Sequence, residues 1–171
     1  MRLRSSPFRR DRRAGVRRAP GVHVARGVRF EVAQGAEIVL GEGCLIGEAT
    51  RIVVAPGCRV EVGASAVLGE RCTIVAHSGV TIGAGARLGH GAVVVDFDHV
   101  FDDVERPIRE QPLESAPVTI GAGALIGLGA SVLRGVVVGE RATVDPRAVV
   151  TRDVPADGHV GGVPAKPVVA S

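Results

Sequence analysis

The sequence predicts an all-β fold in which short strands and tight turns repeat as the stacked coils of a parallel β-helix. Three observations predict it: an aliphatic residue recurs every six positions, a glycine and a small residue follow it at fixed distances, and aromatic residues are nearly absent. The chain of 171 residues has four Phe and neither Trp nor Tyr, although 46% of it is hydrophobic. A core of Val, Ile, Leu and Ala suits narrow layers stacked one above another.

The six-residue period runs from about Leu40 to Asp153 and differs from the periods of a helix and of a simple hairpin. Each unit reads aliphatic, Gly, two variable residues, a small residue and one variable residue. The aliphatic and small residues can both point inward and fill a triangular prism, and we expect the glycine to supply the positive φ of a tight turn. Three units then make one coil, with neighbouring strands about 4.8 Å apart. The aliphatic positions are Leu40, Ile46, Ile52, Val62, Leu68, Ile74, Ile82, Leu88, Val94, Ile120, Ile126, Val132, Val138, Val144 and Val150.

Three longer steps interrupt the period. The ten-residue step from Ile52 to Val62 and the eight-residue step from Ile74 to Ile82 predict small turn insertions. The 26-residue step from Val94 to Ile120 predicts an extruded, acid-rich loop at about 100–117. A polar loop of this length in a regular core is typical of a functional segment.

Charge divides the chain into a tail and a body. Eight of the 21 basic residues are arginines in residues 1–20, which leaves 13 basic against 17 acidic residues in the rest. We expect residues 1–20 to be a basic, disordered tail and residues 21–171 to be one β-helix domain with a first, imperfect coil at 22–38. Because the basic excess belongs to the tail, the body lacks the charge expected of a nucleic-acid-binding domain.

The cysteines and the hydropathy pattern limit other classes of protein. Cys44, Cys58 and Cys72 are an odd number at 14-residue intervals, which argues against a disulfide framework, and Cys44 and Cys72 fall in the small inward position. The sequence has no apolar run of the roughly 18 residues that a membrane span needs. No apolar segment of a signal peptide follows the arginines, so we expect a cytoplasmic protein.

The loop and the C-terminal end carry motifs that are more specific than the repeat. Asp98-His99 is followed by Arg-Pro-Ile at 106–108 and by Ala-Pro-Val-Thr-Ile-Gly at 116–121. The end of the chain reads Val-Thr-Arg-Asp-Val-Pro at 150–155 and Gly-Gly-Val-Pro-Ala-Lys at 161–166. Together with the repeat, these motifs resemble the galactoside, maltose and polysaccharide O-acetyltransferase branch of the hexapeptide-repeat acyltransferase superfamily. The resemblance implies a left-handed parallel β-helix with one extruded loop and a short C-terminal extension, assembled as a homotrimer with active sites between subunits.

The resemblance also implies an activity, in which acetyl-CoA donates an acetyl group to a hydroxyl of a sugar or polysaccharide-type acceptor and His99 is the catalytic base. The reaction must remove the hydroxyl proton, and an imidazole with a pKa of about 6.5 accepts it at cellular pH. We expect direct attack without an acyl-enzyme and an oxyanion held by a backbone N–H. Asp96 or Asp98 would orient the imidazole. The two alternate onto the same face, so the sequence does not choose between them, and a backbone carbonyl could serve instead.

Acetyl-CoA is expected as the acyl-donor substrate, and no metal is expected. In relatives the coenzyme lies in a groove beside the C-terminal coils, and Arg152 and Lys166 suit its phosphates because cations pair with phosphate oxygens through charge-assisted hydrogen bonds. Relatives commonly have Gly-Ala-Gly where this chain has Asp-Pro-Arg at 145–147, and proline removes a backbone donor. The candidates carried over by position are Leu128, Pro146, Thr151, Arg152, Gly161 and Lys166.

Two other histidines, His77 and His90, precede His99, and three functions other than O-acetyl transfer can be weighed against the sequence. His77 aligns with a substrate-binding aspartate of the galactoside-type relatives, which makes it a candidate acceptor-binding residue, whereas His90 falls in a turn and is expected to be solvated. An N-acyltransferase acting on an amino-sugar and a non-catalytic β-helix scaffold stay open. A γ-class carbonic anhydrase would need three converging histidines, and the intervals from His77 to His90 and from His90 to His99 are 13 and 9 residues, which do not fit its spacing. We expect the loop at 100–115 to discriminate between acceptors.

Overall fold

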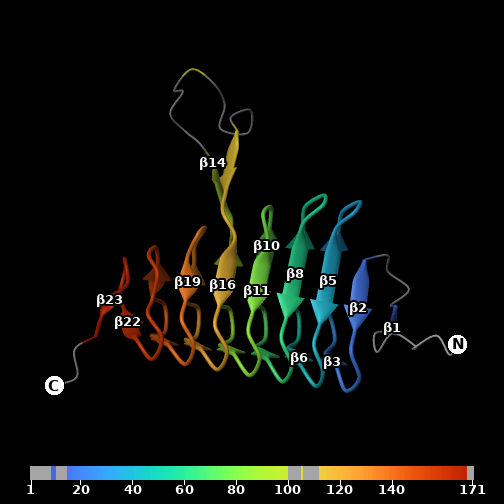
Figure 1. Ribbon diagram of the computed structural model, residues 1–171, viewed down its shortest axis with the longest axis horizontal. Helices are drawn as coiled ribbons and strands as arrows, with labels where there is room; N and C mark the ends of the chain where they lie inside the picture. Colours follow the sequence, from blue (N-terminus) through green and yellow to red (C-terminus); the bar gives the residue numbers. More distant parts are fainter. Residues whose placement is uncertain (1–8, 11–14, 100–104, 106–111, 169–171) are drawn as a thin grey trace, which may run out of the picture.

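The computed structural model describes residues 9–10, 15–99, 105 and 112–168. These residues form an all-β parallel solenoid of about six turns, and they contain no helix. Each coil contributes one strand to each of three sheets, so the sheets are the long faces of a triangular prism (Figure 1). The predicted parallel β-helix of hexapeptide repeats is confirmed.

The three sheets, called A, B and C in the order in which the chain visits them, stack the equivalent strands of successive coils. Sheet A contains β1 (Arg9–Arg10), β2 (Val16–Arg18), β5 (Glu37–Leu40), β8 (Arg59–Val62), β11 (Val80–Ile82), β16 (Val118–Ile120) and β19 (Val137–Val138). Sheet B contains β3 (His23–Val24), β6 (Leu45–Ile46), β9 (Val67–Leu68), β12 (Arg87–Leu88), β17 (Leu125–Ile126), β20 (Thr143–Val144), β22 (His159–Gly161) and β23 (Lys166–Pro167). Sheet C contains β4 (Arg29–Val32), β7 (Arg51–Val54), β10 (Thr73–Ala76), β13 (Val93–Val95), β18 (Ser131–Val132) and β21 (Val149–Val150). The turns between the sheets form three rows, the A–B, B–C and C–A corners.

The core fills the prism as the repeat predicts. Every aliphatic residue of the six-residue period is at most 3% exposed, and the small residues that follow are completely buried, Cys44 and Cys72 among them. Parallel pairing stacks like on like, so Ile52, Ile74, Val94, Val132 and Val150 lie one above another in sheet C. Each completely buried branched side chain contributes roughly 1.5–3 kcal/mol relative to an exposed one.

The glycine that follows the aliphatic residue has a different role from the one expected. The positive φ angles occur two residues further on, as at Gly91, and that later position also accepts Ala49 and Arg71. Gly89 is required by space, because a Cβ atom there would lie 2.7 Å from the backbone nitrogen of Leu128 in the next coil. The glycine after each aliphatic residue therefore lets the backbones of neighbouring coils come into contact, and the turn conformation is set separately, two residues further on.

The expected turn insertions before Val62 and Ile82 are also corrected. In β7 and β8 both Ile52 and Val54, and both Val60 and Val62, point into the core. The extra residues therefore lengthen the strands of sheets A and C on both sides of a short turn. The six-residue period is interrupted here because each of these lengthened strands carries two inward-pointing residues. The longer strands also make the C–A corner of the first coils project.

The ordered coils begin earlier than the expected boundary at residue 20. Val16 is 1% exposed and pairs with Ile38, so β2 already belongs to sheet A. Of residues 1–14, the structure describes only β1. At the other end, Val154 bridges to Val138, and β23 pairs antiparallel with β22 and ends sheet B.

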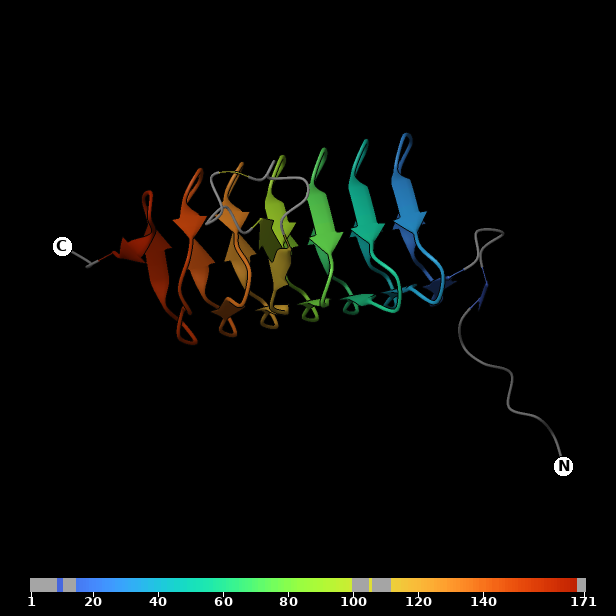
Figure 2. The same ribbon diagram turned by 90° about the horizontal axis from the view of Figure 1, so that it is seen from above.

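The long excursion leaves the prism at the C–A corner, between β13 and β16 (Figures 1 and 2). Its base is an antiparallel pair, β14 (Phe97–His99) and β15 (Leu113–Ser115), in which His99 lies opposite Leu113. The backbone N–H of Ala116 donates to the carbonyl of Asp96 over 2.9 Å, which joins the two ends of the excursion. Residues 100–104 and 106–111 of the loop expected to choose the acceptor lie outside the described residues.

Candidate functional site

The C–A corner brings together His77, Asp96, Phe97 and His99. His77 lies in the turn between β10 and β11, and the other three lie where the next coil gives way to the excursion. The His99 side chain is exposed, and that of His77 is half-buried. Two predicted residues from neighbouring coils, the catalytic His99 and the acceptor-binding His77, are thus on the same row of turns.

Asp96 is a completely buried carboxylate that holds the preceding turn. Its Oδ1 accepts the backbone N–H of His77 over 2.7 Å, and its Oδ2 accepts those of Ser78 and Gly79 over 2.7 and 2.6 Å. Three N–H donors compensate the cost of burying the charge. Both oxygens of Asp96 are therefore engaged with backbone.

The two aspartates proposed to orient the His99 imidazole have other hydrogen-bond partners. Asp98 is exposed, and its Oδ1 accepts the backbone N–H of His99 over 2.8 Å. Among the described residues, neither Asp96 nor Asp98 is hydrogen-bonded to the imidazole. The group that orients His99 stays a prediction, and Asp96 could contribute only through the backbone that it holds.

The Phe97 ring contacts both histidine rings of this corner. The centroids of His77 and Phe97 are 4.4 Å apart with an interplanar angle of 44°, and those of Phe97 and His99 are 6.0 Å apart in an edge-on arrangement at 77°. These separations lie within the range in which aromatic pairs attract each other. Sequence reasoning missed Phe97, although it is one of only four aromatic residues outside the histidines.

Cys58 lies beside the same turn. Its thiol donates to the carbonyl of His77 over 3.0 Å. Burial raises the pKa of the Cys58 thiol, and the negative charge of Asp96 raises it further. The thiol is therefore a weak hydrogen-bond donor to the turn and is poorly suited to act as a nucleophile at neutral pH.

Two pockets adjoin this corner. One, of about 470 Å³, lies on the side of the first coils and is lined by His77, Glu31 and mainly apolar residues such as Val53 and Pro56. The other, of about 360 Å³, lies on the side of the last coils and is lined by Val95, Phe97, Asp98, Leu133, Arg134 and Thr151. His77 and Phe97, whose rings are in contact, each line one of the two.

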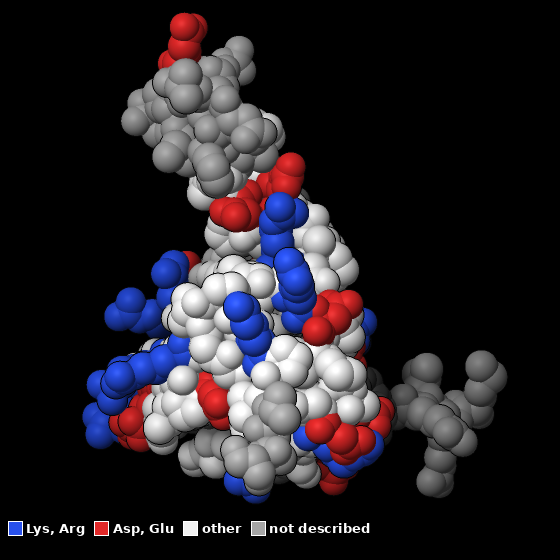
Figure 3. Space-filling view, turned by 90° about the vertical axis from the view of Figure 1, so that its left-hand side faces the viewer, with Lys and Arg blue, Asp and Glu red and all other residues white. Residues whose placement is uncertain are grey.

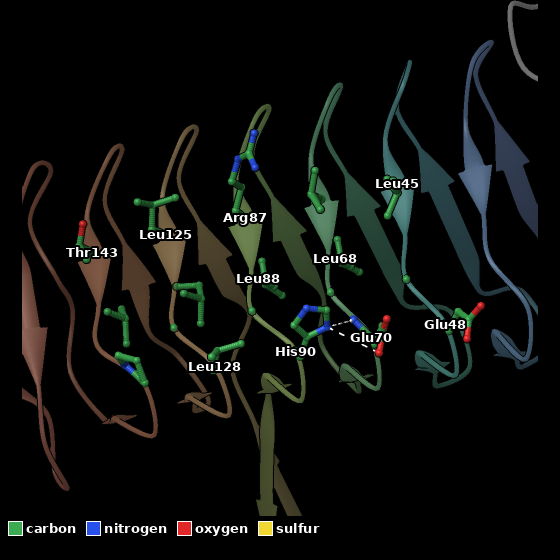
Figure 4. A pocket seen from close by; sticks show the side chains of 18 of the residues that line it. Leu45, Glu48, Leu68, Glu70, Arg87, Leu88, His90, Leu125, Leu128 and Thr143 are labelled. Atoms are coloured by element: carbon green, nitrogen blue, oxygen red, sulfur yellow. Dashed lines mark hydrogen bonds and ion pairs between the residues drawn. The ribbon is translucent and has the colours of Figure 1, made fainter.

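A third and larger pocket, of about 640 Å³, is a groove along the outer face of sheet B. Figure 4 shows its two rows of side chains, one on the strands with Leu45, Arg87 and Leu125, the other in the B–C turns with Glu70, His90 and Leu128. Leu45, Leu125 and Leu128 are 39%, 44% and 52% exposed. The groove therefore combines apolar side chains that are accessible from outside with a few polar ones.

His90 in this groove has a partner that the sequence did not predict. Its Nδ1 accepts the backbone N–H of Glu70 over 2.9 Å, and the Glu70 carboxylate lies 3.9 Å away (Figure 4). Because Nδ1 is used as an acceptor, a neutral His90 carries its proton on Nε2. His90 thus offers a hydrogen-bond donor to the groove, and it has no free lone pair with which to act as a base.

The six coenzyme candidates fall into two separate groups. Leu128 and Pro146 line the sheet B groove, and Gly161 and Lys166 face each other across the β22–β23 pair at the end of the same sheet. Thr151 and Arg152 lie on the C–A corner, after β21. A single chain brings the candidates together within each group and leaves the two groups at different corners of the prism.

The C-terminal end presents basic side chains, as the view along the axis shows (Figure 3). Arg152 and Lys166 are exposed and form no ion pair with any described residue, so they are available to an anion. Arg141 is paired with Asp157 over 2.7 Å. Oδ1 of Asp145 lies 2.7 Å from Nε2 of His159 at the end of the groove.

Within residues 9–10, 15–99, 105 and 112–168, no three His, Cys, Asp or Glu side chains are grouped so that they could hold a metal ion. Nor do these residues form a helix with the length and hydrophobicity that crossing a membrane requires.

Comparisons with known proteins agree with the repeat. Residues 59–95 and 117–152 match the family model described as the hexapeptide repeat of succinyl-transferase. The probable acetyltransferase Rv3034c of Mycobacterium tuberculosis is 36% identical over 75 residues, which are 44% of this chain and 25% of that protein. The match thus spans only about a quarter of that relative.

Solved structures show the same fold. The hexapeptide-repeat acetyltransferase VCA0836 of Vibrio cholerae, in complex with acetyl coenzyme A, is 24% identical with a TM-score of 0.67 over 80% of this chain and 71% of that one. A variant of AntD, an N-acyltransferase from Bacillus cereus bound to dTDP and coenzyme A, is 14% identical with a TM-score of 0.69 over 92% and 82%. The polySia-specific acetyltransferase NeuO is 18% identical with a TM-score of 0.59 over 86% and 84%.

Proposed function

We propose that this protein is an acyl-CoA-dependent acyltransferase that moves an acetyl group from acetyl-CoA to a hydroxyl of a sugar or polysaccharide-type acceptor. The observation that carries the proposal is the C–A corner, where the exposed His99 stands at the start of the excursion, next to Phe97 and Asp98, which line one of the two pockets of this corner. The likeness to solved acyltransferases in fold, and the acetyl coenzyme A and coenzyme A bound to two of them, support the same activity.

The proposed reaction is a direct transfer with His99 as general base. The imidazole takes the proton of the acceptor hydroxyl while the oxygen attacks the thioester carbonyl. The tetrahedral intermediate collapses with loss of the coenzyme A thiolate, and the imidazolium returns the proton to the sulfur. The exposure of His99 on β14 leaves its ring accessible to an acceptor.

The coenzyme is proposed to bind between copies of the chain. Its pantetheine would lie in the sheet B groove beside Leu128 and Pro146, whose apolar walls suit an uncharged, flexible arm. Lys166 at the end of sheet B, and Arg152 from the C–A corner of the copy that supplies His99, would meet its phosphates. Because the groove and His99 are at different corners, a second copy must supply the base, and a closed trimer satisfies this for all three copies. Covering the exposed leucines of the groove would contribute to such an assembly.

An N-acyltransferase acting on an amino-sugar is the second candidate. AntD, which shares the fold, is an N-acyltransferase. The sequence resemblance also aligns His77, an imidazole, with a substrate-binding aspartate of the galactoside-type family. Both reactions need a base and an acyl-CoA, so a panel of acceptors that differ only in hydroxyl against amino group separates them. Exclusive use of the amino compounds would contradict O-acetyl transfer.

The experiment that tests the proposed function first is a thermal melt with and without acetyl-CoA, because it requires no acceptor. A specific ligand at about 100-fold excess over its Kd stabilises the folded state by about 2.7 kcal/mol. We expect the rise in Tm to be lost in the Arg152→Ala/Lys166→Ala variant and kept in Arg29→Ala, which changes an exposed arginine of the first coils. No rise at millimolar acetyl-CoA would favour a non-catalytic scaffold.

A further inference from the structure

The C–A corner contains a connected chain of contacts that the proposed reaction does not yet use. It runs from the buried Asp96 carboxylate to the 77–79 turn, from that turn to the His77 ring, and through Phe97 to His99. Asp96 and Phe97 are adjacent in sequence, and strand alternation directs the first into the core and the second outward. One short segment therefore contacts both histidines of the site.

The Asp96 end of this chain is rigid. Three short hydrogen bonds from successive N–H groups fix the backbone of the turn, and the Cys58 thiol binds the His77 carbonyl from the preceding coil. The carbonyl of Asp96 is itself bonded to Ala116 at the return of the excursion. The backbone under His77 is thus held from both neighbouring coils.

At the other end of these contacts, the imidazole of His99 needs a contact that holds it in place. The side chain is exposed on a three-residue strand that stands out from the prism, and the backbone N–H of His99 donates to the neighbouring Asp98 carboxylate. A general base must be held at the reacting proton, because small misplacements lower the rate of transfer strongly. The edge-on contact with Phe97 is the contact through which the described corner can restrain the imidazole.

We propose that Phe97 and Asp96 are positioning residues of the site: Asp96 fixes the turn that carries His77, and the Phe97 ring, packed on His77, holds the imidazole of His99. The inference rests on the proposed function in that it assigns His99 as the base. The rings of His77, Phe97 and His99 then form one aromatic unit, so a change to the Phe97 ring disturbs the acceptor-binding candidate and the base together. It also assigns Asp96 a role through backbone rather than through the imidazole.

Proton NMR of the histidine rings tests this inference without an acceptor. In the wild type, the ring current of Phe97 should displace the Hε1 and Hδ2 resonances of His77 and His99. Phe97→Leu keeps an apolar side chain and removes the ring, and we expect both sets to move toward the positions found in an unstructured peptide. Phe97→Tyr keeps the ring and should leave them displaced. His23, His90 and His159 are internal controls, and single His→Gln variants assign the resonances.

Kinetics separates positioning from a purely structural role. With an acceptor that the wild type acetylates, kcat should fall about tenfold or more in Phe97→Leu, with KM for acetyl-CoA unchanged, and Phe97→Tyr should restore it. Asp96→Asn places an amide donor against N–H donors, so it should move the resonances of His77 and Phe97 and lower Tm. If that variant does not fold, the Phe97 pair still decides.

Unchanged His77 and His99 resonances in Phe97→Leu, or an unchanged kcat, would overturn the inference. Failure of the proposed function has a different signature, because a wild type that binds no acetyl-CoA in the melt leaves the NMR result intact. Displaced ring resonances in such a protein would support the aromatic unit and overturn its assignment to acyl transfer.

Discussion

The B–C and C–A corners are rows of turns on the same prism, yet they are built differently. The B–C turns that flank the groove are similar in coil after coil, and the row forms one wall of a long groove with an apolar floor. The C–A turns change in length from coil to coil, contain the buried Asp96 and give rise to the excursion. Regular repetition produces a surface on which an extended ligand can lie, and departures from the repeat position the groups that we propose for the chemistry.

The largest effect expected from this difference is on kcat, which should depend on His99 of the C–A corner and hardly on His90 of the B–C corner. Loss of a general base lowers the rate of transfer by about 10²–10⁴-fold, so His99→Ala should lose at least 100-fold in kcat while keeping its Tm. His90→Ala should stay within a few-fold of wild-type kcat and raise KM for acetyl-CoA, because His90 offers a donor and no lone pair. Steady-state kinetics checks both, and a greater loss of kcat at His90 would reverse the assignment of the two corners.

Two glycines of one B–C turn, Gly89 and Gly91, separate the effect of coil contact on stability from that of turn conformation. Gly89→Ala forces a Cβ to 2.7 Å from the Leu128 nitrogen, and overpacking against backbone should cost about 3 kcal/mol. Gly91→Ala meets no atom within 4 Å and has only its φ of 70° to accommodate, which should cost about 1 kcal/mol. Urea unfolding of both variants measures the difference, and equal losses would show that turn conformation, not coil contact, selects Gly89.

The reactivity of the three cysteines distinguishes the C–A corner, where Cys58 lies, from the core, where Cys44 and Cys72 are buried. Burial raises the pKa of Cys44 to about 11, and Cys72 is likewise raised by burial. At pH 8 we expect iodoacetamide to modify Cys58 first and more slowly than a free thiol, because a raised pKa leaves little thiolate. Asp96→Asn should accelerate modification of Cys58 by removing the nearby negative charge. Mass spectrometry of the labelled protein follows the order, and prior labelling of Cys44 would contradict the packing of the core.

The smallest effect concerns the charges of the A–B corner. Arg141 lowers the pKa of Asp157 below its ordinary value, so the pair stabilises the fold above the unfolded pKa and this contribution is lost as pH falls through the folded pKa. Asp157→Asn should therefore be slightly less stable than the wild type at pH 7, with the difference disappearing in acid and in high salt. Asn also tolerates the positive φ of this position. Glu42→Gln, an exposed carboxylate without an ion pair among the described residues, is the control.

The sequence predicted those parts of the molecule that repetition determines. The inward positions of Ile74 and Cys72 followed from periodicity alone, because a repeated unit must bury the same face in every coil. The lengthened β7 and β8 were not predicted, since two inward residues per strand disturb the phase without changing the residue types. The start of the coils at Val16 was hidden by the surrounding arginines.

Individual residues of the candidate site could be named from the sequence, but which of them lie together in space could not be predicted. His77 and His99 could be named from their motifs, but the Phe97 ring between Asp96 and Asp98 gave no signal because its partners are 20 and 2 residues away. The separation of Leu128 from Thr151 could be found only from the corners on which they lie. The bond from Glu70 to His90 depends on coil stacking and is likewise invisible in a linear sequence.

The measurement that tests the central claim most directly is a crystal structure of the protein with a non-reactive acetyl-CoA analogue. We predict that the pantetheine lies along the sheet B groove of one copy, beside Leu128 and Pro146, with the thioester carbon facing His99 of a second copy. An analogue bound with no histidine of the C–A corner facing the thioester, or absent from the groove at saturating concentration, would contradict it.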